Sequence, residues 1–219
     1  MQKTIGVLGG MGPYAALEFC RLILDNTKVK GDSDHFRVIL DNNTKIPSRT
    51  RAIKYKEETP VKETVKAINN LSLAGADFVV LPCNSIHYWY EDISKEIIIP
   101  WINMMDVVAE KVKGKRTLVL GAHIVTELGL YNKKINAVYL DDKNVVHDAI
   151  YNIKKNGFLK DKNKSLLRAI NAAYASYDIV LLACTEFSMM KKDLESINIP
   201  YVDSSLEYAK WVIKNATDE

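Results

Sequence analysis

The chain has 219 residues, of which 47 % are hydrophobic and 26 % are charged, and its formal net charge is +3. This length allows one large domain or two small ones with their own cores, and the balanced, scattered charge argues against a nucleic-acid partner. The apolar runs are too short for a signal peptide or a membrane span, so we expect no membrane partner. Three widely spaced cysteines without a CxxC pair favour reduced thiols and a cytoplasmic location.

Short apolar segments alternate with amphipathic ones along the whole chain. The expected strands cover residues 4–10, 36–43, 77–83, 116–122, 135–140 and 178–184. Pro13 opens a helix that ends near residue 25, a second helix covers residues 60–76, and a third, residues 206–215, closes the chain. This alternation predicts an α/β fold with parallel sheets.

One pattern of residues occurs twice. "IGVLGG" near residue 5 resembles "TLVLGA" near residue 117, and "DFVVLPCNS" (77–85) resembles "DIVLLACTE" (178–186). An Ile-Pro pair follows each cysteine, with its proline 17 residues after the first cysteine and 16 after the second. General self-similarity of α/β chains explains the apolar pattern less well than a repeat, because the cysteines and prolines match too.

The repeat predicts two similar α/β domains, residues 1–103 and 104–204. Each is expected to have a parallel four-stranded sheet, with the two domains related by pseudo-two-fold symmetry and the active site in the cleft between them. The closing helix, within residues 205–219, is expected to pack back on the first domain.

Cys83 and Cys184 follow strands in the two halves, where parallel α/β sheets bind their ligands. A following helix N-terminus would lower a thiol's pKa and attract a carboxylate. Two thiols on opposite sides of one carbon can remove a proton from one face and deliver a proton to the other, which inverts a stereocentre without a cofactor. Cys20 lies within an apolar helix and is expected to be a buried packing residue.

The motifs "GVLGGMGP", "IPSR", "LPCNS", "LACTE" and "IPYVDSS" resemble the aspartate/glutamate racemase family in order over essentially the whole chain. The resemblance implies pyridoxal-independent racemisation of an acidic amino acid, aspartate or glutamate, and usually a homodimer. It also implies that Cys83 and Cys184 are the two catalytic acid/base groups. No cofactor and no metal are expected.

Two cations are candidates for binding the substrate's distal carboxylate. Arg49 follows an Ile-Pro in a loop after a strand, and a guanidinium binds a carboxylate with two parallel hydrogen bonds. The resemblance favours Arg49 over Arg51 and assigns the same role to Lys155. The neighbouring Lys154 leaves this register open.

Smaller groups complete the predicted substrate site. Backbone can approach a ligand closely at the first glycine loop, and polar residues that follow the cysteines can hold a substrate or cap helices. These candidates are Met11, Gly12, Asn84, Ser85, Thr185 and Glu186.

Other functions fit the sequence less well. His87 lies one helical turn after Cys83, but a metal site would need a third ligand, so we expect a structural role. The glycine loop is out of register with a dinucleotide fingerprint. A hydantoin racemase or maleate isomerase and a non-catalytic, two-lobed anion-binding protein remain alternatives.

Overall fold

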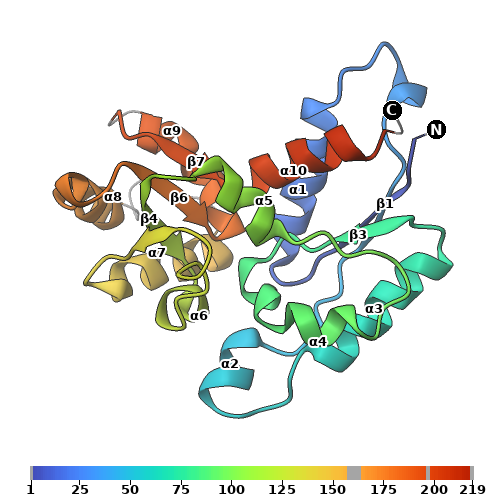
Figure 1. The fold of residues 1–219 in the computed structure, drawn as a ribbon, viewed down its shortest axis with the longest axis horizontal. Coiled ribbons are helices and arrows are strands. Elements are labelled where there is room, and N and C mark those ends of the chain that lie inside the picture. Colours follow the sequence, from blue (N-terminus) through green and yellow to red (C-terminus); the bar gives the residue numbers. More distant parts are fainter. Residues whose placement is uncertain (1, 157–163, 196–197, 218–219) are drawn as a thin grey trace. The chain divides into compact units, whose positions relative to one another are not determined.

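The computed structural model describes residues 2–156, 164–195 and 198–217 (Figure 1). The chain divides into two compact units, residues 1–104 with 205–219 (unit 1) and residues 105–204 (unit 2). Both units are α/β with parallel sheets, so the predicted fold class is confirmed. None of the helices in the described ranges is long and apolar enough to cross a membrane.

Unit 1 is built on a three-stranded parallel sheet in the order β2-β1-β3. Its strands are β1 (Ile5–Leu8), β2 (Val38–Asp41) and β3 (Phe78–Val80). β1 and β3 are buried along their whole length, as expected for continuous apolar strands that helices cover on both faces.

The helices of unit 1 lie on both faces of this sheet, with α1 and α10 on one side and α3 and α4 on the other (Figure 1). They are α1 (Pro13–Asn26), α2 (Arg49–Lys54), α3 (Val61–Leu73), α4 (Tyr90–Ser94) and α10 (Ser204–Asn215), with the 3-10 turns η1 (Asp32–Asp34) and η2 (Asn84–Trp89). Pro13 occupies the first turn of α1 as predicted, because that position needs no N–H donor.

Helix α10 returns the C-terminal segment to unit 1. The fully buried Tyr208 packs against Phe19 of α1 with 5.4 Å between ring centroids, and its hydroxyl donates to the Ile102 carbonyl at 2.5 Å. Beyond the helix, the Lys3 N–H donates to the Ala216 carbonyl at 2.8 Å. These contacts hold both chain ends of unit 1 against the same core.

Unit 2 is built on a four-stranded parallel sheet in the order β5-β4-β6-β7. The strands are β4 (Arg116–Gly121), β5 (Asn136–Val138), β6 (Ile179–Ala183) and β7 (Tyr201–Asp203). The helical elements are α5 (Met104–Lys111), α6 (His123–Glu127), α7 (Lys143–Asn156), α8 (Lys164–Ala172), η4 (Tyr174–Ser176), η5 (Thr185–Met190) and α9 (Lys191–Glu195).

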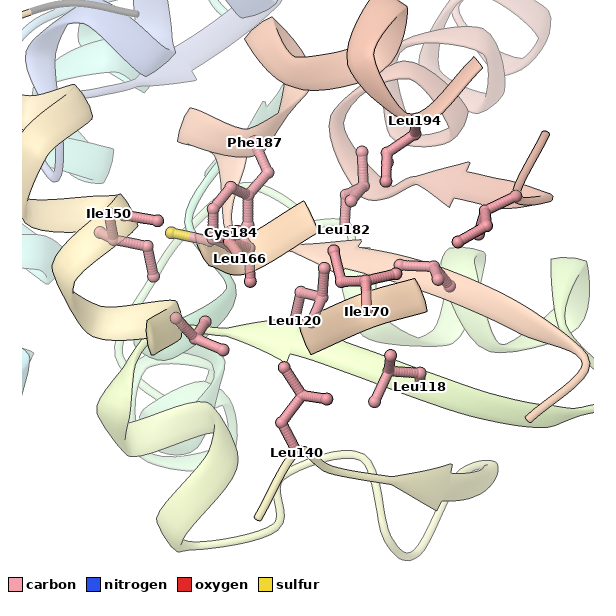
Figure 2. Close-up of a cluster of buried hydrophobic side chains, with 14 of the residues drawn as sticks. Leu118, Leu120, Leu140, Ile150, Leu166, Ile170, Leu182, Cys184, Phe187 and Leu194 are labelled. Carbon is pink, nitrogen blue, oxygen red and sulfur yellow. The ribbon is translucent and has the colours of Figure 1, made fainter. Parts of the chain in front are cut away.

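The core of unit 2 lies between its sheet and helices α7 and α8. Figure 2 shows Leu118 and Leu120 of β4 and Leu182 of β6 beside Ile150, Leu166 and Ile170 of the two helices. Cys184 belongs to this cluster, and Cys83 belongs to the corresponding cluster of unit 1 under α3. Each thiol therefore lies at the border of a packed core.

The internal repeat is visible in the strand registers. Ile5 pairs with Phe78 in unit 1, and Thr117 pairs with Ile179 in unit 2, each partner five residues before its cysteine. The repeat extends to the strand entrances: the carboxylate of Asp77 accepts from the Thr4 N–H at 2.6 Å and that of Asp178 from the Arg116 N–H at 2.7 Å.

The prediction of four strands in each sheet is wrong for unit 1. The fourth segment makes only one parallel bridge, Val79 with Trp101, in contrast to the full strand β7. Val79 bonds to the Trp101 segment, so Pro82, three residues later, lies on the side of β3 that faces β1. Pro82 has no N–H, which agrees with the end of the β1–β3 ladder at Val80. The Leu81 carbonyl accepts from the Cys83 N–H at 2.7 Å. This turn directs the chain out of the sheet after β3 ends at Val80.

Candidate functional site

Both predicted cysteines lie just beyond the carboxyl end of a strand, the edge strand β3 in unit 1 and the central strand β6 in unit 2. Cys83 follows β3 and Cys184 directly follows β6, and each is the residue before a six-residue 3-10 turn. They are free thiols with 6 % and 7 % of their surface exposed. These short turns are not the α-helix starts that the sequence suggested, so their contacts must be considered one by one.

The sulfur of Cys83 has two polar neighbours. It lies 3.6 Å from the Met11 carbonyl oxygen and 3.4 Å from the Ser85 hydroxyl. Met11, from the glycine loop after β1, is buried, and Gly12 is the N-cap of α1. The glycine loop and the first cysteine motif therefore meet at one edge of the sheet.

Arg49 belongs to the same cluster. Its Nη2 donates to the Met11 carbonyl at 3.1 Å and its Nη1 to the Pro47 carbonyl at 3.0 Å. Its Nε is buried without a hydrogen-bond partner in the described part of the chain. The Met11 carbonyl thus contacts both the guanidinium and the Cys83 thiol, which places a cation with an unused donor near that sulfur.

Arg51 is placed differently, although it is only two residues away. Its guanidinium binds the carboxylate of Glu57 with two hydrogen bonds, at 2.7 and 2.5 Å, and its side chain is 60 % exposed. This ion pair lies on the surface of unit 1, so Arg49 is the better candidate for a bound carboxylate.

The sulfur of Cys184 lies beside a buried carboxylate. It donates to Oε2 of Glu186 at 2.8 Å, and the Thr185 hydroxyl contacts the same oxygen at 3.4 Å. Burial raises the pKa of the Cys184 thiol well above its usual value, and the negative charge of Glu186 raises this pKa further, while Lys154 opposes the shift. Glu186 and Thr185 are both buried.

The structure brings Lys154 to this cluster and directs Lys155 elsewhere. Lys154 Nζ lies 3.4 Å from Oε1 of Glu186, whereas Lys155 Nζ lies 6.0 Å from the ring centre of the exposed Tyr151. Ile150 lies one turn before Lys154 on the same face of α7, and Figure 2 shows the Cys184 side chain directed toward it. Lys154 lies on the face of α7 that is turned toward Cys184, and Lys155 does not, so Lys154 is favoured as the cation near this thiol.

His87 has a structural contact pattern. Its Nε2 accepts from the Met104 N–H at 3.0 Å, so its Nδ1 carries the proton and donates to the Cys83 carbonyl at 3.0 Å. The ring joins the first cysteine motif to the start of α5 and does not contact the thiol through these bonds. Asn84, the next residue after Cys83, is also buried.

The repeat indicates one further candidate position that the sequence analysis missed. With Thr117 equivalent to Ile5, His123 is equivalent to Met11, directly beyond β4. Its Nε2 lies 2.9 Å from Glu127, and its ring stacks on that of His147 at 4.6 Å. Aligning the two halves residue by residue would have revealed this position.

A site for a tightly bound metal is not evident among the residues described. They contain no group of three or more His, Cys, Asp or Glu side chains that could hold an ion. The ionisable groups that lie close to the two thiols include the carboxylate Glu186 and the cations Arg49 and Lys154, which suit proton transfer and carboxylate binding.

The chain is similar to known racemases. The family model described as Asp/Glu/hydantoin racemase matches residues 8–210. A broad specificity amino-acid racemase, RacX of Bacillus subtilis, is 24 % identical over 222 residues, covering 95 % of this chain and 96 % of its own. Both alignments include the two cysteine motifs and the segments that carry the cations.

Solved structures give the same result. An aspartate racemase from Picrophilus torridus is 32 % identical, with a TM-score of 0.87 and coverage of 98 % of this chain and 94 % of its own. A glutamate racemase from Thermus thermophilus, solved with β-chloro-D-alanine, shares the fold with a TM-score of 0.65 at 15 % identity, covering 97 % of this chain and 80 % of its own.

Proposed function

The chain belongs to the Asp/Glu/hydantoin racemase family and is an amino-acid racemase, and we propose that it interconverts the enantiomers of an acidic amino acid. Aspartate is the preferred substrate in this proposal and glutamate the second choice. The similarity to an aspartate racemase at 32 % identity supports this order.

The observation that carries the proposal is the equivalence of Cys83 and Cys184. The strand registers place both thiols at the same position of the repeat, and both are free and nearly buried. A racemase works in both directions and therefore needs one acid/base group for each face of the α-carbon. Two equivalent thiols on two similar sheets meet that requirement.

The proposed reaction transfers one proton at each thiol. The thiolate of one cysteine takes the α-proton, which leaves the electron pair on the α-carbon, and the thiol of the other cysteine donates a proton to the opposite face. The first sulfur ends protonated and the second ends as a thiolate, so the reverse reaction exchanges the roles. No pyridoxal phosphate, metal or nucleotide takes part in this scheme.

Arg49 is the proposed contact for the side-chain carboxylate of the substrate. Two carbonyl oxygens orient its guanidinium, and its buried Nε has an unused donor. An incoming carboxylate would satisfy that donor and neutralise the charge. Met11, Gly12, Asn84, Ser85, Thr185 and Lys154 of α7 are proposed to complete the substrate site.

The free state of all three cysteines fits a reducing compartment. We propose a cytoplasmic enzyme that forms a homodimer, as the family resemblance implies. Size-exclusion chromatography with light scattering measures the oligomeric state, and a mass of one chain would contradict the dimer.

A panel of substrates tests the proposed function. Enzyme dialysed against EDTA and hydroxylamine is incubated with the L-enantiomers of aspartate, glutamate, asparagine and alanine, and with a hydantoin and maleate. Chiral chromatography should detect D-aspartate at the highest rate. Faster turnover of a neutral amino acid, a hydantoin or maleate would contradict the substrate assignment, and activity that returns only with a cofactor would contradict the mechanism.

A further inference from the structure

The two cysteine motifs match in position but differ two residues later. Ser85 stands two residues after Cys83, and Glu186 stands two residues after Cys184. Each of these side chains contacts the sulfur of its own motif, the serine at 3.4 Å and the glutamate at 2.8 Å. The repeat is therefore broken at the side chain that touches the thiol.

This difference changes the charge around the two sulfurs. Cys184 donates its proton to a carboxylate that is itself buried, with 6 % of the side chain exposed. Cys83 contacts a hydroxyl and the Met11 carbonyl, which also accepts from the cationic Arg49. A thiolate next to the carboxylate would meet a like charge, whereas a thiol there makes a charge-assisted hydrogen bond.

We propose that Glu186 is a positioning residue that keeps the proton on Cys184 in the free enzyme, so that Cys184 is the harder of the two thiols to ionise. The inference rests on the proposed two-thiol mechanism and assigns unequal resting states to its two groups. The free enzyme is then prepared for the enantiomer whose α-proton faces Cys83. Turnover of the other enantiomer requires Cys184 as the thiolate, so Cys184 must first release its proton.

Lys154 limits the size of this asymmetry. Its Nζ lies 3.4 Å from the second oxygen of Glu186, so it partly neutralises the carboxylate and favours a Cys184 thiolate when one forms during turnover. A racemic equilibrium requires equal kcat/KM in both directions, so this asymmetry must be measured on the thiols themselves.

Alkylation of each cysteine measures the proposed states without any turnover. Iodoacetamide reacts with the thiolate, and mass spectrometry of the peptides that contain Cys83 and Cys184 gives separate rates from pH 6 to 11. The two thiols are almost equally buried. Access of the reagent changes the maximal rate of alkylation but not the pH at which half of that rate is reached. We expect this midpoint to lie at lower pH for Cys83 than for Cys184.

Variants then identify the cause. Glu186→Gln should lower the Cys184 midpoint by at least about one pH unit and leave the Cys83 midpoint unchanged. One pH unit corresponds to a tenfold larger thiolate fraction at any pH below the midpoint. Glu186→Ser copies the other motif and should act in the same direction, while Ser85→Glu should raise the Cys83 midpoint. Glu110→Gln removes an equal charge from an exposed pair with Lys113 and should change neither cysteine.

Lys154→Met provides a test in the opposite direction and keeps Glu186 in place. This variant should raise the Cys184 midpoint. It still tests the proposal if circular dichroism shows that the Glu186 variants do not fold. Equal midpoints for the two cysteines in the wild type, or a Cys184 midpoint that neither Glu186 nor Lys154 variants move, would overturn the proposal. Absence of racemisation would overturn the proposed function and leave these alkylation results unaffected.

Discussion

At the residue scale, the function of each thiol depends on the atoms around its sulfur. Cys20 also has a free thiol, but it lies on α1 away from the carboxyl end of any strand. Burial alone raises the pKa of Cys20 to about 11, so it is protonated at neutral pH. Cys83 and Cys184 differ from it because a hydroxyl, a carbonyl or a carboxylate contacts the sulfur.

Cys83→Ala and Cys184→Ala should each reduce racemisation in both directions by at least ~10²–10⁴, the usual contribution of an acid/base group. The remaining thiol can still remove the proton that faces it. In heavy water, NMR should therefore show α-proton exchange of one enantiomer in one variant and of the other enantiomer in the second. Cys20→Ala should behave as wild type. Wild-type rates in either of the first two variants would exclude the two-thiol mechanism.

Arg49→Lys should weaken the binding of acidic substrates while it keeps the charge. A lysine cannot contact the Met11 and Pro47 carbonyls and a carboxylate with one planar group. Loss of a charged hydrogen bond of roughly 1.5–3 kcal/mol corresponds to a rise in KM of about 10- to 100-fold.

Steady-state kinetics with aspartate and asparagine measure this effect, and discrimination between the two should also fall. Arg51→Lys, whose guanidinium pairs with Glu57, is the matched control and should keep the wild-type KM. An unchanged KM in Arg49→Lys would assign carboxylate binding to another residue.

At the element scale, the strand that ends early in unit 1 shows how backbone chemistry shapes the site. β6 continues to Ala183, whereas β3 stops at Val80 because Pro82, at the position equivalent to Ala183, has no N–H. Cys83 is therefore carried on a turn, and Cys184 directly follows a strand. Pro82 is visible in the sequence, and its effect could have been predicted from the alternation of hydrogen bonds along a strand.

His87 holds this turn of unit 1 against the first residue of α5. His87→Ala removes the acceptor of the buried Met104 N–H and the donor to the Cys83 carbonyl. Leaving such groups unpaired costs about 1–3 kcal/mol, so the urea midpoint should fall and racemisation should fall with it.

His35→Ala is the control for this prediction, because it removes a ring from the same unit whose Nδ1 has no hydrogen-bond partner in the described structure. Its urea midpoint should stay close to that of the wild type. Equal midpoints for His87→Ala and the wild type would show that the ring does not hold the turn.

At the scale of the whole molecule, the sequence was sufficient for the α/β fold and for strands β1 to β6, whereas β7 was not among the expected strands. The periodicity of apolar residues, the glycines at the ends of the first strand of each half and the repeated cysteine motif are local signals, and each corresponds to an observed element. The contacts of Glu186 and the choice between Lys154 and Lys155 were not predictable in this way. They depend on which face of α7 is turned toward η5. The packing of Ile150 into the core fixes that face.

The buried acidic groups make the stability of the whole chain sensitive to alkaline pH. Burial raises the pKa of Cys184 in unit 2 and of Tyr208 in unit 1 well above their ordinary values of 9.0 and 10.0. The unfolded chain then releases these protons at lower pH than the folded chain. Their stabilising contribution is therefore complete below about pH 9 and is lost as the pH rises toward the folded values.

The free energy of unfolding, measured with urea from pH 7 to 10.5, should be nearly constant up to about pH 9 and then decrease. Each group contributes a slope of about 1.4 kcal/mol per pH unit once its unfolded form has ionised. Tyr208→Phe removes one of them, so its decrease above pH 10 should be shallower than that of the wild type. At pH 7 the same variant loses the hydrogen bond to Ile102, which costs about 1 kcal/mol. A wild-type free energy that stays constant to pH 10.5 would mean that these groups ionise equally easily in the folded and unfolded chains.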